Sequence, residues 1–70
     1  MVEYMAKTVG EVYYVGVKPG DKIKAGMTLV SVEAMKVQTS ICATVDGTVK
    51  EVKVKENDMV NLGDVLLTTE

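Results

Sequence analysis

The sequence has no histidine, no arginine and only one cysteine, and each absence excludes a class of function. Without histidine, the chain has no Ser-His-Asp or Cys-His nucleophilic site and no histidine-ligated metal. All eight basic residues are lysine and the formal net charge is -2, so neither a basic excess nor a guanidinium group is present to bind nucleic acid. Cys42 has no partner for an internal disulfide, which fits a reducing compartment.

Long hydrophobic runs are also missing. The longest apolar run is only a few residues, too short for a membrane-spanning helix, and residues 1–5 lack the basic start and apolar stretch of a signal peptide. We therefore expect a cytoplasmic protein, or a piece of one, that does not insert into membranes. Hydrophobic residues make up 47% and charged residues 26% of the 70 positions, which is typical of a folded globular chain. The length predicts a single domain over residues 1–70 with one small core.

The hydrophobic pattern predicts an all-β fold. No segment shows the apolar stripe of an amphipathic helix, whereas β-branched residues recur in short runs that are separated by turn residues. Turns are expected over residues 18–21, 45–47 and 56–58. The predicted strands are Gly10–Val17, Leu29–Glu33, Val37–Ala43, Thr48–Val54 and Val65–Glu70.

An internal repeat organises the chain. Shifted by 37 residues, residues 6–33 align with residues 43–70 without a gap. Within each half the valines step by three and then by two, so we expect a β-bulge after Val12 and after Val49. Gly26 and Gly63 occupy matching corners, where a positive φ would explain glycine. The ten identical pairs are Ala6/Ala43, Gly10/Gly47, Val12/Val49, Val15/Val52, Val17/Val54, Lys18/Lys55, Asp21/Asp58, Gly26/Gly63, Leu29/Leu66 and Glu33/Glu70.

The repeat predicts how the two halves are arranged. Neither half can bury its apolar face alone, so we expect two small sheets packed face to face about a pseudo-twofold axis, as a flattened barrel or sandwich. If Leu29–Glu33 pairs with Ser40–Cys42, the symmetry pairs Leu66–Glu70 with Glu3–Met5. The two termini should then be adjacent strands at the end of the molecule opposite Lys36.

The segment between the halves, with its tip at residues 34–37, has no repeat equivalent and is the place to seek chemistry. Ala34-Met35-Lys36 is predicted to be the tip of a hairpin. A two-residue hairpin turn normally contains Asn-Gly or Asp-Gly, so Met35-Lys36 is a poor local choice. Such a conflict is typical of a functional site. The pattern alone also permits an ordinary solvated turn lysine.

The residues around this tip resemble those of a known family. Glu33-Ala34-Met35-Lys36 resembles the attachment motif of biotinyl domains, the carrier modules of biotin-dependent carboxylases and decarboxylases. The spacing also matches that family in Gly10-x-Val12-x-x-Val15-x-Val17-Lys18-x-Gly20-Asp21 before the motif, and in Asp46-Gly47 and Gly63-Asp64 after it. Two departures are that Val37 replaces a second methionine and that residues 6–10 contain no proline. The thumb segment of some bacterial carriers has no room here.

The resemblance implies a fold and a role. The fold would be a barrel-sandwich hybrid of two four-stranded antiparallel sheets. The domain would be a carrier rather than an enzyme, with biotin attached covalently to Lys36 and with Ala34, Met35 and Glu33 beside the attachment point. Its partners would be biotin protein ligase, biotin carboxylase, and carboxyltransferase or decarboxylase subunits. The attached biotin would shuttle carboxyl groups between their sites.

Two alternatives to a biotin carrier remain open. A lipoyl carrier has the same fold and also modifies a hairpin lysine, although the residue before that lysine is usually Asp rather than Met. Dual attachment of biotin and lipoate belongs to the same alternative. An unmodified all-β adaptor that carries the same hairpin is a different class of function. The mass added by modification would separate the three.

Several individual residues permit a structural as well as a functional interpretation. Met35 could dock the ligase or carboxylase, or fold back to fill a gap in the core. Glu33 could guide the ligase, but its repeat at position 70 favours a role at a strand end. Cys42 is predicted to be a small buried hydrophobic residue. Asp21 and Asp58, repeated in the turns, are predicted to be solvated.

Overall fold

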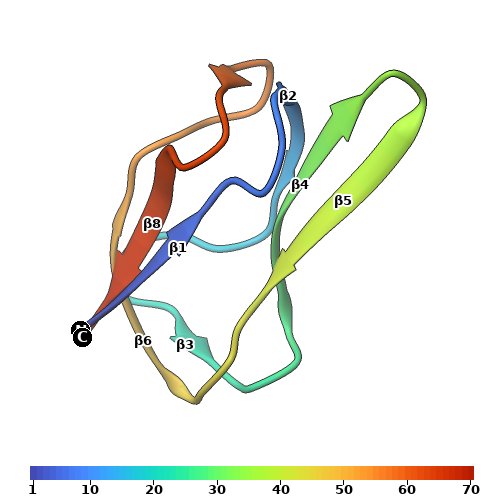
Figure 1. Ribbon diagram of the computed structural model, residues 1–70. Coiled ribbons are helices and arrows are strands. Elements are labelled where there is room, and N and C mark those ends of the chain that lie inside the picture. Colours follow the sequence, from blue (N-terminus) through green and yellow to red (C-terminus); the bar gives the residue numbers. More distant parts are fainter.

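The computed structural model describes all 70 residues and contains eight β-strands (Figure 1). It has no helix, and thus none that is long and apolar enough to cross a membrane. The strands are β1 (Val2–Met5), β2 (Gly10–Val15), β3 (Lys22–Ile23), β4 (Thr28–Ala34), β5 (Val37–Cys42), β6 (Gly47–Val52), β7 (Met59–Val60) and β8 (Val65–Thr69).

The strands form two four-stranded antiparallel sheets, with the orders β1-β8-β6-β3 and β5-β4-β2-β7. The 37-residue repeat relates them strand for strand, because β1 corresponds to β5, β8 to β4, β6 to β2 and β3 to β7. The all-β architecture of two packed four-stranded sheets is therefore confirmed. The five predicted strands are also present, although β2 and β6 each end two residues earlier than predicted.

The two predicted bulges are present at equivalent positions. Where β2 pairs with β4, the register shifts between Val12 and Tyr14, and where β6 pairs with β8 it shifts between Val49 and Glu51. An extra residue in one strand lets valines three positions apart face the same side of the sheet. Val12 is accordingly fully buried, and Val15 packs against the core. The β-bulge thus explains why the valines in each half are spaced by three residues and then by two.

The short strands β3 and β7 are missing from the predicted strands. Each has only two residues and pairs with a strand of the other half of the repeat. Lys22 pairs with Thr48, and Met59 pairs with Glu11. Two residues are too few to show an alternating pattern, and their partners are distant in sequence. Each half thus contributes one strand to the sheet built mainly by the other half.

The repeated aspartates are partly exposed to solvent, in keeping with the prediction, and they also stabilise their turns. An Asp21 side-chain oxygen accepts a hydrogen bond from the backbone amide of Lys18 at 3.0 Å, and Asp58 accepts the same bond from Lys55 at 3.0 Å. The main-chain carbonyl of Asp21 also accepts a hydrogen bond from the Val49 amide at 2.8 Å. Each turn is therefore closed by its own aspartate and held against a strand of the other half.

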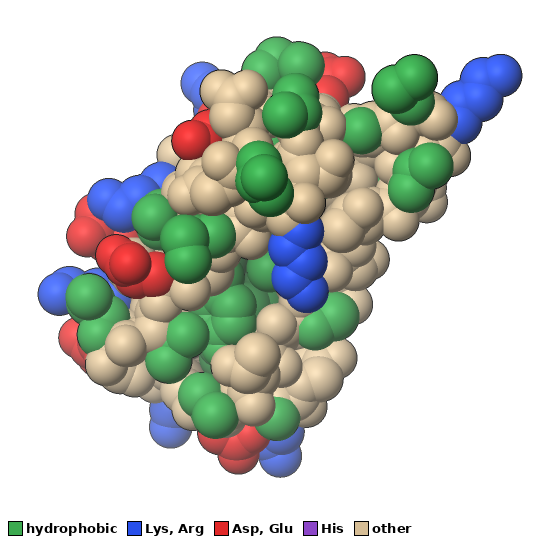
Figure 2. Space-filling model, in the orientation of Figure 1, with side chains coloured by type: hydrophobic (Ala, Val, Ile, Leu, Met, Phe, Trp, Pro, Cys, Tyr) green, Lys and Arg blue, Asp and Glu red, His purple; other side chains and the backbone are tan.

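A single core lies between the two sheets, and repeat-related residues contribute to it equally. Leu29 and Leu66 are both fully buried, and Ile23 and Val60 are nearly so. One side of the sandwich, between the edge strands β1 and β5, is hollowed and lined with apolar side chains (Figure 2). The other buried apolar residues are Tyr4, Ala6, Val12, Val17, Val30, Val32, Ile41, Ala43, Val49 and Leu67.

The two termini are paired as predicted. β1 and β8 are adjacent antiparallel strands, with Val2 opposite Thr69 and Tyr4 opposite Leu67. Both chain ends lie together, and the β4–β5 hairpin extends from the opposite side of the molecule (Figure 1). The hairpin tip is therefore remote from both ends of the chain.

The two corner glycines have the predicted positive φ, 90° at both Gly26 and Gly63. No atom lies within 4 Å of the position that a Cβ would take at either residue, so a side chain would meet strain in the backbone rather than a clash. We expect Gly26→Val or Gly63→Val to lower the free energy of unfolding by about 1–3 kcal/mol. Urea denaturation measures this. Ala25→Val, at an exposed neighbour without a positive φ, is the control, and glycine variants as stable as the parent would contradict the explanation.

Candidate functional site at the β4–β5 hairpin

The turn between β4 and β5 consists of Met35 and Lys36 alone. Ala34 pairs with Val37 on either side of it. Met35 has a φ of 49° and Lys36 a φ of 69°, and two positive values are what a type I′ hairpin turn requires. The left-handed conformation costs a residue other than glycine on the order of 1–3 kcal/mol. The predicted two-residue turn is confirmed, and strand pairing on both sides holds it in place.

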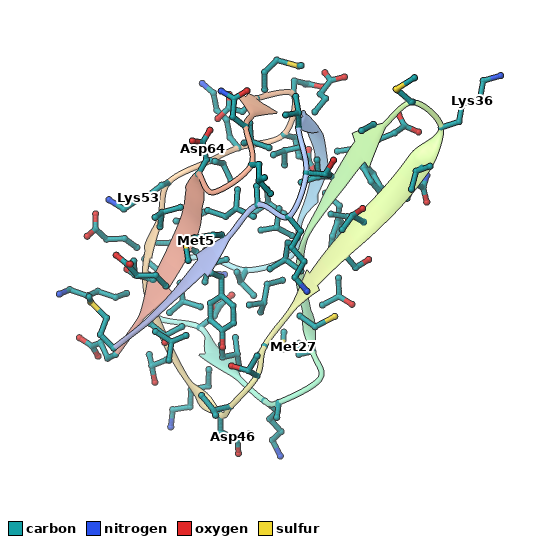
Figure 3. The ribbon with its side chains drawn as sticks, viewed as in Figure 1. Met5, Met27, Lys36, Asp46, Lys53 and Asp64 are labelled. Atoms are coloured by element: carbon teal, nitrogen blue, oxygen red, sulfur yellow. The ribbon has the colours of Figure 1, made fainter.

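This turn presents the Lys36 amine to solvent. The lysine side chain points away from the body of the domain, beyond the end of the hairpin (Figure 3). The one ion pair of the structure joins Lys53 to Glu51 at 3.8 Å, so no carboxylate holds Lys36. Because the amine is neither buried nor paired, an approaching protein can enclose it without first breaking an interaction within the domain.

Met35 lies outside the core, with 96% of its surface exposed. Its interpretation as a gap-filling side chain is therefore wrong. Ala34, at the last position of β4, is partly buried. The structure brings both residues directly beside Lys36, where the sequence had placed them. A role for Met35 in docking stays a prediction.

Glu33 lies on the other face of the hairpin from Ala34, because successive residues of a strand point to opposite faces. It is exposed, and it pairs with Gln38 of β5 on one side and with Glu11 of β2 on the other. Two carboxylates are thus neighbours on this face. Neither forms a hydrogen bond or an ion pair with Lys36. A guiding role for Glu33 stays a prediction.

Gly10 brings β2 close to β4 at Val32 and Glu33, near the lysine turn. A Cβ at this position would lie 2.5 Å from the backbone oxygen of Glu33 and 2.8 Å from a methyl group of Val32. At the equivalent Gly47, the nearest atom would be 3.6 Å away. The repeat pairs Gly10 with Gly47, so the sequence provides no reason to expect different surroundings for the two. Only at Gly10 does another strand approach too closely for a side chain.

A groove runs beside the hairpin on the face of Ala34. It has a volume of about 640 Å³, and we call it the hairpin groove. Val9 is 54% exposed and Leu62 69% exposed, so neither belongs to the core, and sequence reasoning missed both. The available signal was their difference from the repeat equivalents Asp46 and Ala25. One wall is formed by Ala34, Met35, Val37 and Thr39, and the other by Lys7, Thr8, Val9 and Leu62.

Cys42 is exposed, so the prediction that it is buried is wrong. It is the last residue of the edge strand β5 and follows the buried Ile41, so strand alternation turns it outward. Its Sγ lies 3.7 Å from the Thr28 hydroxyl oxygen on the neighbouring strand. Cys42 borders the hollow between β1 and β5 and lies at the end of β5 that is away from the lysine turn.

Comparison with known proteins agrees with this geometry. The family described as "Biotin-requiring enzyme", which covers biotin and lipoyl attachment domains, matches residues 3–69. The chain belongs to this family. Its resemblance to biotinyl domains, inferred from residues 33–36 and their surroundings, is thereby confirmed. An attachment domain is a carrier, and its solvent-exposed hairpin lysine is consistent with that class.

Among curated proteins, the chain is 50% identical over 58 residues to the biotin/lipoyl attachment protein of Bacillus subtilis (strain 168), covering 83% of this chain and 80% of that protein. It is 44% identical over 61 residues to the mitochondrial propionyl-CoA carboxylase alpha chain of Homo sapiens, covering 87% of this chain but 8% of that protein. The lipoyl domain of the 2-oxoglutarate dehydrogenase complex from Azotobacter vinelandii superposes with a TM-score of 0.78 at 27% identity, over 96% of this chain and 95% of that domain.

Proposed function

We propose that this domain is a biotin carboxyl carrier and that Lys36 is its attachment point. The observation that carries the proposal is the two-residue turn of positive φ, which holds an unpaired primary amine at the far end of the hairpin. Met35 before the lysine, where lipoyl domains usually have Asp, favours biotin. The similarity to a propionyl-CoA carboxylase chain supports the same assignment.

Attachment requires only the amine from this chain. Neutral Lys36 Nζ attacks the acyl carbon of the biotinyl adenylate held by biotin protein ligase. A nitrogen–carbon bond forms, the carbon–oxygen bond to AMP breaks, and the nitrogen loses a proton. The sequence has no histidine and the structure places no carboxylate on Lys36, so the ligase must accept that proton. Replacing one ammonium with a neutral amide takes the formal net charge from -2 to -3.

The rest of the domain positions the modified lysine. Attached biotin supplies a ring that can carry a carboxyl group between a biotin carboxylase and a carboxyltransferase or decarboxylase. The hairpin holds the lysine away from the body, and the paired chain ends leave from the opposite side (Figure 1). A connection to a larger assembly would therefore leave the lysine free to visit both enzymes, at the high effective concentration that a tether provides.

Attachment of lipoate, alone or in addition to biotin, is the second candidate function. The printed name of the Bacillus subtilis relative includes both groups, and a lipoyl domain has the same fold. The amine chemistry at Lys36 would be identical, since either carboxylic acid is activated as an adenylate by its own ligase.

Intact mass spectrometry tests the proposal. The purified chain is incubated with ATP and either biotin and biotin protein ligase, or lipoate and a lipoate ligase. We expect the addition of one biotinyl group and little or no lipoyl group. Addition of lipoate alone would contradict biotin carriage, addition of both in separate reactions would establish a dual acceptor, and no addition would favour the unmodified adaptor.

A further inference from the structure

The backbone follows the same path at two corners of the molecule that the pseudo-twofold axis relates. At the corner beside the hairpin, the Gly63 amide donates to the carbonyl of Ala6 at 3.0 Å. At the equivalent corner, the Gly26 amide donates to the carbonyl of Ala43 at 2.8 Å. Each glycine has a φ of 90°. The fold therefore makes the same backbone demands at both corners, and any difference between their side chains needs another explanation.

The side chains next to these glycines differ in chemistry. Away from the hairpin, the Ala25 amide donates to the Asp46 carboxylate at 2.9 Å, which closes the corner with a polar contact. At the hairpin corner the equivalent positions are Leu62 and Val9, both largely exposed. Here Asp64 closes the corner instead, because its carboxylate accepts a hydrogen bond from the Asn61 amide at 2.8 Å, and Leu62 and Val9 are left facing solvent. Because the same backbone is built with Ala and Asp, neither Leu62 nor Val9 is needed for the fold.

These two side chains are continuous with apolar residues of the lysine turn. Val37 is 63% exposed and Met35 almost fully exposed, and both line the hairpin groove opposite Leu62 and Val9. The space-filling view shows apolar side chains around the hairpin tip, with the lysine projecting beyond them (Figure 2). An exposed apolar surface that is continuous with a reactive side chain is typical of a site that contacts another protein.

We propose that the hairpin groove docks the enzyme that acylates Lys36, by receiving an apolar side chain of that enzyme. This inference rests on the proposed function. The groove then contributes to the affinity for the ligase, while Lys36 alone takes part in the chemistry. Leu62 and Val9 are docking residues from two loops that a linear attachment motif does not include.

The reach of the lysine favours this partner over the carboxylase. The unmodified amine is separated from the backbone only by the four-carbon lysine stem. An enzyme that acts on this amine must therefore approach the turn closely and cover its flanking residues, Met35 and Val37. Enzymes that act on the far end of the modified side chain are separated from the turn by the added acyl chain as well. They can bind that end without contacting the groove.

The two faces of the hairpin favour the groove as the contact surface. The opposite face presents the neighbouring carboxylates of Glu33 and Glu11. Burying unpaired carboxylates is unfavourable, whereas covering the groove removes apolar surface from water. A ligase that docks through an apolar side chain therefore gains most by approaching from the groove face.

Leu62→Asp and Val9→Asp test the inference, with Val45→Asp as the matched control. Val45 is 50% exposed and precedes Asp46, at the corner away from the hairpin, so it receives the same change in a similar environment. Initial rates of biotin attachment are measured over a range of carrier concentrations, with thermal unfolding to show that all variants fold. We expect each groove variant to raise the KM for the carrier roughly tenfold with kcat nearly unchanged, as for loss of one anchoring contact. The control should stay within about twofold of the parent, as is usual for a surface change outside an interface.

Prolonged incubation then yields fully biotinylated variants, whose mass is verified before they are given to biotin carboxylase. We expect their KM for the carboxylase to equal that of the parent. The docking inference alone would be overturned if the groove variants had the parent's KM with the ligase. It would also be overturned if the Val45→Asp control raised that KM as much as the groove variants do. A larger effect on the carboxylase than on the ligase would overturn the choice of partner. If the parent chain accepts no biotin, the proposed function fails and this inference fails with it.

Discussion

Replacing Lys36 with arginine is expected to abolish biotin attachment and leave the fold unchanged. The guanidinium group stays protonated at any pH at which a protein is folded, so it has no free electron pair to attack an acyl adenylate. The side chain is exposed and makes no ion pair, and its backbone strain at a φ of 69° is the same for either residue. Intact mass after incubation with ligase, biotin and ATP measures the loss, which should be complete.

Peptide mapping of the parent chain locates the acceptor among its eight lysines. Lys50→Arg is the matched control, because Lys50 is also exposed but lies in the middle of β6. This variant should accept one biotinyl group at the parent's rate. Biotin on the Lys36→Arg chain, or on Lys18 or Lys50 of the parent, would show that the hairpin turn is not the attachment site.

Gly10→Ala should lower the free energy of unfolding by about 1–3 kcal/mol, the usual cost of forcing an extra methyl group into packed structure. The new Cβ would lie 2.5 Å from the Glu33 carbonyl, and a backbone atom cannot rotate aside as a side chain can. Either β2 or the part of β4 near the lysine turn must move. The same substitution at Gly47 meets only ordinary contacts, the nearest at 3.6 Å, and should leave stability close to that of the parent.

Urea denaturation of both variants measures the difference, and the repeat makes them an unusually close pair. Because Gly10 packs on the hairpin beside the lysine turn, Gly10→Ala should also slow biotin attachment under conditions where the variant is fully folded. Equal stability of the two variants would contradict the view that close packing, rather than the start of a strand, requires glycine at position 10.

The internal repeat explains why so much of the fold could be predicted from one sequence. Matching Val12 with Val49 located both bulges, and matching residues 29–33 with 66–70 placed the termini side by side. These features depend on strand alternation and symmetry, both of which are visible in the order of residues. The lysine turn was found for the opposite reason, because it lies outside the repeat and contradicts local turn preferences.

The features that could not be predicted depend on contacts between distant segments. β3 and β7 exist because two residues of one half meet a strand of the other, and no local pattern encodes that meeting. Cys42 is exposed because it alternates with the buried Ile41 and Ala43, but all three residues are apolar, so the sequence does not show which of them face the core. The hairpin groove forms where two loops and the hairpin converge, so the difference of Val9 and Leu62 from their repeat equivalents could mark them as unusual but could not show that they meet in one groove.

The pairing of β1 with β8 makes the chain equivalent to a ring that has been opened at one of two symmetry-related turns. A short turn between Glu70 and Met1 would close the ring, and new ends could be opened in a surface loop without removing any strand. Circular permutants of this domain should therefore be accessible, since surface termini that lie close together favour such rearrangement. For the same reason the whole domain can be inserted into an exposed loop of a host protein. The two points of the loop to which it is joined need to be separated only by the distance between two paired strands.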